Sequence, residues 1–251
     1  MKALILSLLF LVLSACHPTA DFEKIDIRIA FGYKDARPAR FVGDRYERVA
    51  FIQELTEPCA GFETLACGFE RSIEDGDLLS KLVLTSTGRR LNVNLRVTAS
   101  SVSPDDDANR KNPFQKEMSK LSKDNFLEGL NGSNATFYVG HSRDGGGPDF
   151  SPPQMTRSKH VNYAAYKKNK TGFKLLLKTM ARARHEKKET EVLGLISCAS
   201  TKLFADKIAA IAPGTRLVTA PQLLYYADSL KMMRKSLSDI ISHKLLIAES
   251  N

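Results

Sequence analysis

Two short apolar segments in the second half of the chain place the tightest limit on its fold. Residues Ala135–Val139 are small, β-branched or aromatic and lead, after one glycine, to His141, and a loop rich in Gly and Pro follows. Residues Val192–Ile196 repeat this construction and lead, after one serine, to Cys198. The pattern predicts two buried strands that each deliver a reactive side chain to the edge of a sheet.

A basic, helix-like segment separates the two strands. We expect Thr171 to cap its helix, which buries one apolar face. A strand–helix–strand crossover of this length favours parallel neighbours in one sheet. Parallel neighbours bring His141 and Cys198 to the same edge, where ligands and chemistry collect in open α/β sheets.

The flanking sequence continues this alternation of strands and helices. Helical spacing of apolar residues extends from Phe114 to Leu130, Ser200 is expected to cap another helix, and residues 215–220 form a short strand before a final amphipathic helix. The alternation predicts an α/β domain over residues 101–251, with a mainly parallel sheet flanked by helices.

Residues 25–100 are expected to form a β-rich N-terminal region. Apolar residues alternate over Ile25–Phe31 and over Leu91–Val97, as they do in half-buried strands. Residues 81–85 join the second of these through a turn at residues 86–89 and form a hairpin with it. Two weaker strand patterns cover Val49–Leu55 and Phe62–Phe69.

Two groups of residues bear on metal binding. The polar stretch 101–113 contains Asp105–Asp107, but the spacing of a calcium loop is absent, and the stretch is interpreted as a loop. His160, His185 and His243 show no metal-ligand spacing with Cys or carboxylate residues. We therefore expect no metal site and no cofactor.

The first residues form a targeting segment. Ala3–Leu13 is almost wholly apolar, is preceded by a lysine, and is shorter than the roughly 20 residues of a membrane-spanning helix. The sequence Leu-Ser-Ala-Cys that ends at Cys16 resembles the bacterial lipobox. This resemblance implies a signal peptide over residues 1–15, acyl chains such as palmitate on Cys16, and a lipid-anchored tether over residues 16–24. The alternative is an ordinary secretory signal with a chance cysteine.

The residue after the lipobox bears on location. His17, and not an Asp, directly follows Cys16. By resemblance to enterobacterial lipoproteins, this implies the outer membrane. The expected location is the bacterial cell envelope, with the protein facing the periplasm or the cell surface.

The net charge of +9 is concentrated in one part of the chain. Residues 157–188 carry many Lys and Arg and few acidic residues. Such a segment suits an anionic envelope surface, and equally a solvated helix face. It lacks the interleaved aromatic residues of a nucleic-acid platform, so no nucleic-acid partner is expected.

The cysteines divide into a pair and a single residue. Cys59 and Cys67 lie eight positions apart in a turn-rich stretch and are the natural disulfide pair in an oxidising compartment. If Cys16 carries lipid, Cys198 is the odd thiol. It is either a buried core cysteine or a residue with a chemical role.

Taken together, a hydrophobic strand ending in Gly-His and a second ending in Ser-Cys resemble the cysteine peptidases of the caspase, legumain and gingipain clan. The resemblance covers about residues 135–220, and Ile196–Ser200 looks most like the gingipain-type cysteine block. It implies a caspase-like layered fold with two strand–helix units before the His strand. It also implies a His141/Cys198 dyad and a peptide or protein substrate.

In the implied mechanism, Cys198 is the nucleophile and His141 the general acid toward the leaving amine. The backbone N–H groups of Ser142 and Cys198 occupy the positions of the oxyanion donors.

Two other functions stay open. Gly140–His141–Ser142 is similar to the nucleophile elbow of an α/β-hydrolase-type serine esterase with Ser142 as nucleophile, although Asp144 replaces a required Gly. The second alternative is a non-catalytic envelope lipoprotein, either a pseudoenzyme or a binding module, in which the His and Cys serve packing.

Overall fold

The structure is a computed structural model that describes residues 22–34, 43–60 and 64–250. The expected signal peptide, Cys16 and the start of the expected tether lie outside the described residues. Within the described residues, no helix combines the length and the apolar character needed to cross a bilayer.

The described strands form one mixed sheet of seven strands in the order β2-β3-β4-β1-β5-β6-β7. The five strands from β4 to β7 in this order run parallel, whereas β3 pairs antiparallel with β4 and β2 pairs antiparallel with β3. The strands are β1 (Phe22–Phe31), β2 (Glu70–Arg71), β3 (Leu78–Leu84), β4 (Arg90–Ala99), β5 (Ala135–Val139), β6 (Val192–Ile196) and β7 (Arg216–Thr219).

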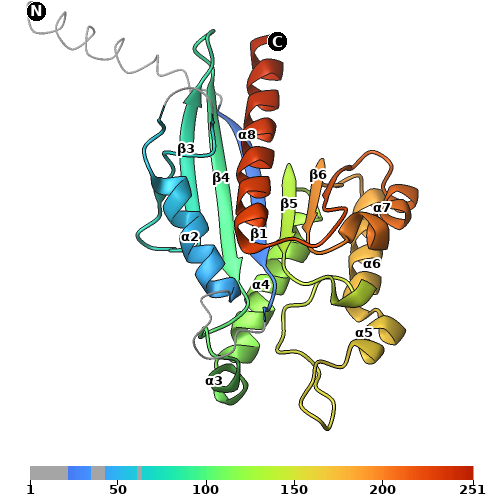
Figure 1. Cartoon of the computed structure of the whole chain (residues 1–251). Helices are drawn as coiled ribbons and strands as arrows, with labels where there is room; N and C mark the ends of the chain where they lie inside the picture. Colours follow the sequence, from blue (N-terminus) through green and yellow to red (C-terminus); the bar gives the residue numbers. More distant parts are fainter. Residues whose placement is uncertain (1–21, 35–42, 61–63, 251) are drawn as a thin grey trace, which may run out of the picture.

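Helices cover both faces of the sheet (Figure 1). Helices α2 and α8 pack on one face, and α4, α6 and α7 pack on the other. The helices are α2 (Asp44–Thr56), α3 (Asp106–Lys111), α4 (Gln115–Gly129), α5 (Tyr163–Asn169), α6 (Thr171–His185), α7 (Ser200–Ile211) and α8 (Tyr226–Ser250), with a 3₁₀ turn η1 (Arg143–Gly145). The predicted α/β fold with a mainly parallel sheet flanked by helices is confirmed.

Burial on both faces explains the uninterrupted apolar character of the two central strands. Every residue of β5 and β6 is buried. In β5, Phe137 faces the core under α2 and α8, whereas Tyr138 faces the core under α4 and α6. Full burial of one such apolar side chain contributes about 1.5 to 3 kcal/mol, so these strands anchor both layers.

Strand β1 joins the two halves of the chain, because it lies between β4 and β5. Its Ile27 pairs with Leu95 of β4 on one side and with Ala135 of β5 on the other. The strands of residues 25–100 and of residues 101–251 therefore belong to one sheet.

Two of the weaker strand predictions are wrong. Val49–Leu55 lies in helix α2, which buries Phe51, Ile52 and Leu55 against the sheet. The spacing of these three residues suits a helix face, and exposed Val49 gave the segment a false strand character. In the other segment, residues 64–69 form no strand. The disulfide between Cys59 and Cys67 closes a loop here, and the chain then continues directly into β2.

The interpretation of residues 101–113 as a loop is also incomplete. Helix α3 begins after Asp105, whose side chain accepts hydrogen bonds from the N–H groups of Asp107 and Ala108. The acidic run is therefore a helix cap and first turn, a location that favours carboxylates.

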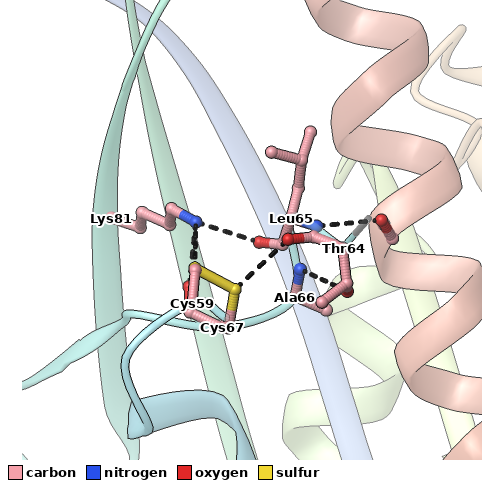
Figure 2. The surroundings of a disulfide bond; sticks show 7 residues. Cys59, Thr64, Leu65, Ala66, Cys67 and Lys81 are labelled. Carbon is pink, nitrogen blue, oxygen red and sulfur yellow. Dashed lines mark hydrogen bonds between the residues drawn. A yellow bond between two sulfur atoms is a disulfide. The ribbon is translucent and has the colours of Figure 1, made fainter. Parts of the chain in front are cut away.

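The predicted disulfide between Cys59 and Cys67 is confirmed, with sulfur atoms 2.01 Å apart (Figure 2). Lys81 of β3 donates from Nζ to the carbonyl oxygens of Leu65, at 3.1 Å, and Cys67, at 2.9 Å. The N–H of Leu65 donates to the hydroxyl of Ser238 in α8 at 3.0 Å. The loop is thus fastened to both the sheet and the last helix.

Candidate functional site

The pairing of β5 with β6 places the candidate dyad at one edge of the sheet. Val139 is the register partner of Ile196, and the N–H of Gly140 donates to the Ile196 carbonyl at 3.2 Å. His141 lies two residues beyond Val139, and Cys198 lies two residues beyond Ile196. The two residues therefore follow the carboxyl ends of adjacent parallel strands at the same level.

Cys198 is the free cysteine among the described residues, and it is partly exposed. It lies in the short turn between β6 and α7, where Ala199 adopts a left-handed conformation with φ 53°. The Sγ atom accepts a hydrogen bond from the N–H of Leu224 at 3.5 Å. The thiol can in turn donate to the carbonyl oxygen of Leu224, which lies 4.0 Å from Sγ.

The loop after β7 forms one wall beside this thiol. The carbonyl of Gln222 accepts the N–H of Ala199 at 2.9 Å, which fixes the loop against the Cys198 turn. On either side of Leu224, the large side chains of Leu223 and Tyr225 are 60% and 70% exposed. Both side chains therefore leave apolar surface exposed in the segment that contacts Cys198.

Tyr138 holds the backbone of His141. Its hydroxyl donates to the His141 carbonyl at 2.9 Å and accepts the N–H of Asp149 at 3.1 Å. Burial, with the nearby charge of Asp149, raises the pKa of Tyr138, so the hydroxyl stays a donor at neutral pH. A Cβ at residue 140 would lie 2.5 Å from this hydroxyl, which explains the glycine before His141.

A buried ion pair closes the loop that follows His141. Arg143 is 1% exposed and donates from Nε to Oδ2 of Asp149 at 3.0 Å. The hydroxyl of Tyr166 donates to the same oxygen at 2.9 Å, and the Arg143 guanidinium lies 5.5 Å from the centre of the Tyr166 ring. Burial and the Asp149 charge raise the pKa of Tyr166 to about 12. Sequence reasoning missed this cluster.

The glycines of this loop permit close packing on the start of helix α6. A Cβ on Gly147, at φ 95°, would lie 2.2 Å from the backbone nitrogen of Phe173. A Cβ on Gly172 would lie 2.0 Å from the Pro148 carbonyl oxygen. The Gly146 carbonyl accepts the Phe173 N–H at 2.8 Å and so satisfies one donor of the helix terminus.

The helix starts themselves differ by one residue from the sequence interpretation. Thr171 and Ser200 are first helical residues rather than caps, because Lys170 and Ala199 hold the cap positions in left-handed conformations. The Ser200 hydroxyl instead donates to the Leu195 carbonyl at 2.6 Å and accepts the N–H of Ala220 at 2.8 Å. It ties β6 to the end of β7.

Two backbone donors lie at the candidate site. Within the described part of the chain, the N–H groups of Ser142 and Cys198 donate to no protein acceptor. The Ser142 side chain is 9% exposed, and its carbonyl accepts the N–H groups of Gly145 and Gly147. A developing oxyanion requires N–H donors of this kind near the nucleophile.

A second buried polar cluster lies where β1 and β4 end. Both oxygens of Asp44 accept hydrogen bonds from Ser101, and Lys34 forms an ion pair with Glu47, which is 1% exposed. Burial raises the pKa of Asp44 and of Glu47. This cluster fastens the chain on both sides of residues 35–42.

No group of three or more His, Cys, Asp or Glu side chains able to hold a metal ion is found in residues 22–34, 43–60 and 64–250. A scan against protein-family models finds no match to this chain, and a search of curated proteins finds no significant match.

Proposed function

We propose that this chain is a cysteine peptidase-like hydrolase that cleaves peptide bonds with a His141/Cys198 dyad. The observation that carries the proposal is the register of β5 and β6, since His141 and Cys198 each follow the paired strand ends Val139 and Ile196 by two residues. In parallel α/β sheets, this edge is where substrates bind.

In this proposal, each part that acyl transfer needs comes from these two residues and the backbone beside them. The Cys198 thiolate attacks the carbonyl carbon, and the negative charge that develops on its oxygen is accepted by the N–H groups of Ser142 and Cys198. His141 gives a proton to the amine that leaves, and an acyl-enzyme remains on the sulfur. Water then hydrolyses the thioester and regenerates the thiol.

The order of elements supports the proposed relation to the caspase, legumain and gingipain clan. That resemblance implies two strand–helix units before the His strand. The chain has β1 followed by α2, and β4 followed by α3 and α4, before β5. The elements after β5 alternate in the same manner.

The exposed apolar side chains beside Cys198 suggest how a peptide is held. Leu223 and Tyr225 flank the residue whose N–H contacts the sulfur. In the proposal they contact apolar side chains of the substrate next to the bond that is cleaved, since they offer unburied apolar surface at the site.

The proposal favours Cys198 over Ser142 as nucleophile. A nucleophile elbow opens a helix directly after its serine. Ser142 is buried and is followed by a three-residue 3₁₀ turn in which Asp144 has positive φ.

The cellular setting in this proposal is the bacterial envelope, with a lipid on Cys16 anchoring the body. The basic residues of α5 and α6 would then face an anionic surface. Their side chains are largely exposed, as either that role or simple solvation requires.

The proposal is tested with a library of internally quenched peptides. Cleavage by the wild-type protein, lost at least a thousandfold in Cys198→Ala and in His141→Ala, is expected. His160→Ala, a change at an exposed loop histidine, is the matched control and retains activity. Cleavage that persists in Cys198→Ala, or a folded wild-type protein that cleaves no member, would contradict the proposal.

A further inference from the structure

Two adjoining cavities lie away from the candidate dyad, between α4 and the segment 146–152. One has a volume of about 300 Å³ and the other about 680 Å³. They share Lys123, Ser151 and Pro152 in their walls, so they join at these residues. Neither His141 nor Cys198 lines either cavity.

Apolar side chains form the larger part of the wall of the smaller cavity. They come from α4, from the loop after β5 and from α6: Phe126, Leu127, Pro148, Phe150, Leu175 and Leu176. The polar residues Asp149, Gln154 and Asn169 also line it. Phe126 and Leu176 are buried, and Leu175 is 36% exposed at the surface. Such walls favour an apolar occupant, because its burial removes hydrocarbon from water.

The larger cavity is strongly basic. Its lining includes Arg110, Lys116, Lys120 and Lys123 and contains no carboxylate. Arg110 and Lys120 pair with acidic residues of their own helices. In the part of the chain that the structure describes, Lys116 and Lys123 form no ion pair. Two lysines that have no ion pair among the described residues therefore line this space.

We propose that the joined cavities bind an anionic amphiphile, with its acyl chain in the smaller cavity and its carboxylate or phosphate head among the lysines. Lys123 stands at the junction, where the charged head of a chain buried in the smaller cavity would lie. The charge of the lining complements an anion and opposes a cation.

The volume of the smaller cavity limits the length of the acyl chain. A cavity of about 300 Å³ holds roughly ten groups the size of a water molecule, whose share of liquid volume is about 30 Å³. A methylene group is of similar size, so a chain of about ten carbons fills the cavity. Below that length, each added methylene raises affinity about three- to fourfold.

The test is calorimetric titration of the folded protein with decanoate and with decyl-chain lysophosphatidylglycerol, each below its micelle concentration. Decanol and decyltrimethylammonium have the same chain without the anion and serve as ligand controls. We expect the anionic ligands to bind at least tenfold more tightly than the controls. Tighter binding of decanoate identifies a free fatty acid as the occupant, and tighter binding of the lysolipid identifies a phospholipid.

Variants separate this site from unspecific attraction to a basic protein. Lys116→Ala/Lys123→Ala should weaken binding of the anionic ligands at least tenfold, and Leu175→Glu should weaken it as well. Lys174→Ala/Lys178→Ala removes two exposed lysines of α6 that line neither cavity and should leave binding unchanged. Equal loss in both double variants, equal binding of decanol, or no binding of either anion would overturn the proposal.

Discussion

The Nε of Arg143 donates to Oδ2 of Asp149 at 3.0 Å, in a pair whose arginine side chain is fully buried. The N–H of Asp149 in turn donates to the hydroxyl of Tyr138, which donates to the carbonyl of His141. The position of the candidate catalytic histidine is therefore connected, through one tyrosine, to an ion pair in the following loop.

Asp149→Asn should destabilise the protein by about 3 kcal/mol, because the change removes a charged partner of the buried Arg143. The effect is measured as the change in the free energy of unfolding by urea titration. Asp144→Asn changes an exposed carboxylate of the same loop and is the matched control. Equal stability of Asp149→Asn and wild type would show that the pair does not hold the loop.

Gly147→Ala should lower the free energy of unfolding by about 3 kcal/mol or more, because the residue has positive φ and its Cβ would meet the backbone of α6. Gly214→Ala, where a Cβ meets nothing within 4 Å, should stay within about 0.5 kcal/mol of wild type. Thermal unfolding of both variants makes the comparison. Similar losses at the two sites would contradict the close approach of the loop and the helix.

Loss of the disulfide in a Cys59→Ser/Cys67→Ser variant should lower the free energy of unfolding by about 2 to 3 kcal/mol, the value for a loop of this size. Dithiothreitol should destabilise the wild type by a similar amount and leave the double variant unchanged. A wild-type protein that is insensitive to the reductant would argue against the bond.

The buried Glu47 should make stability depend on pH. Burial raises its pKa despite the Lys34 ion pair, so the folded state binds this proton more tightly than the unfolded state. The stability that Glu47 contributes is fully present below the pKa of the unfolded state, about 4.3, and is lost as the pH rises through the pKa of the folded state. Relative to Glu47→Gln, the wild type should lose stability as pH rises. A stability difference that is constant with pH would contradict this assignment.

The elements that sequence reasoning predicted well are those in which local pattern and tertiary burial agree. Strands β5 and β6 are buried on both faces, so their apolar runs had few other interpretations. The parallel pairing followed from the helix between them. Helix α2 was missed because its apolar residues are few and exposed Val49 interrupts the helical pattern.

The support of the candidate site was harder to predict than its two reactive residues. Arg143, which pairs with Asp149, and its neighbour Asp144 adopt left-handed conformations, which non-glycine residues rarely do. The close approach of Gly147 to α6 is a tertiary contact that is not readable from local sequence. The Asp105 cap, by contrast, had a local signal that the loop interpretation did not use.

The central claim is that His141 and Cys198 act together, and the rate of Cys198 alkylation by iodoacetamide across pH tests it most directly. Site-resolved mass spectrometry follows Cys198 alone in wild type, His141→Ala and the control His160→Ala. We expect rapid labelling near neutral pH in wild type and in the control, and slower labelling that requires higher pH in His141→Ala. Labelling that is identical in all three proteins, or that occurs only after unfolding, would contradict it.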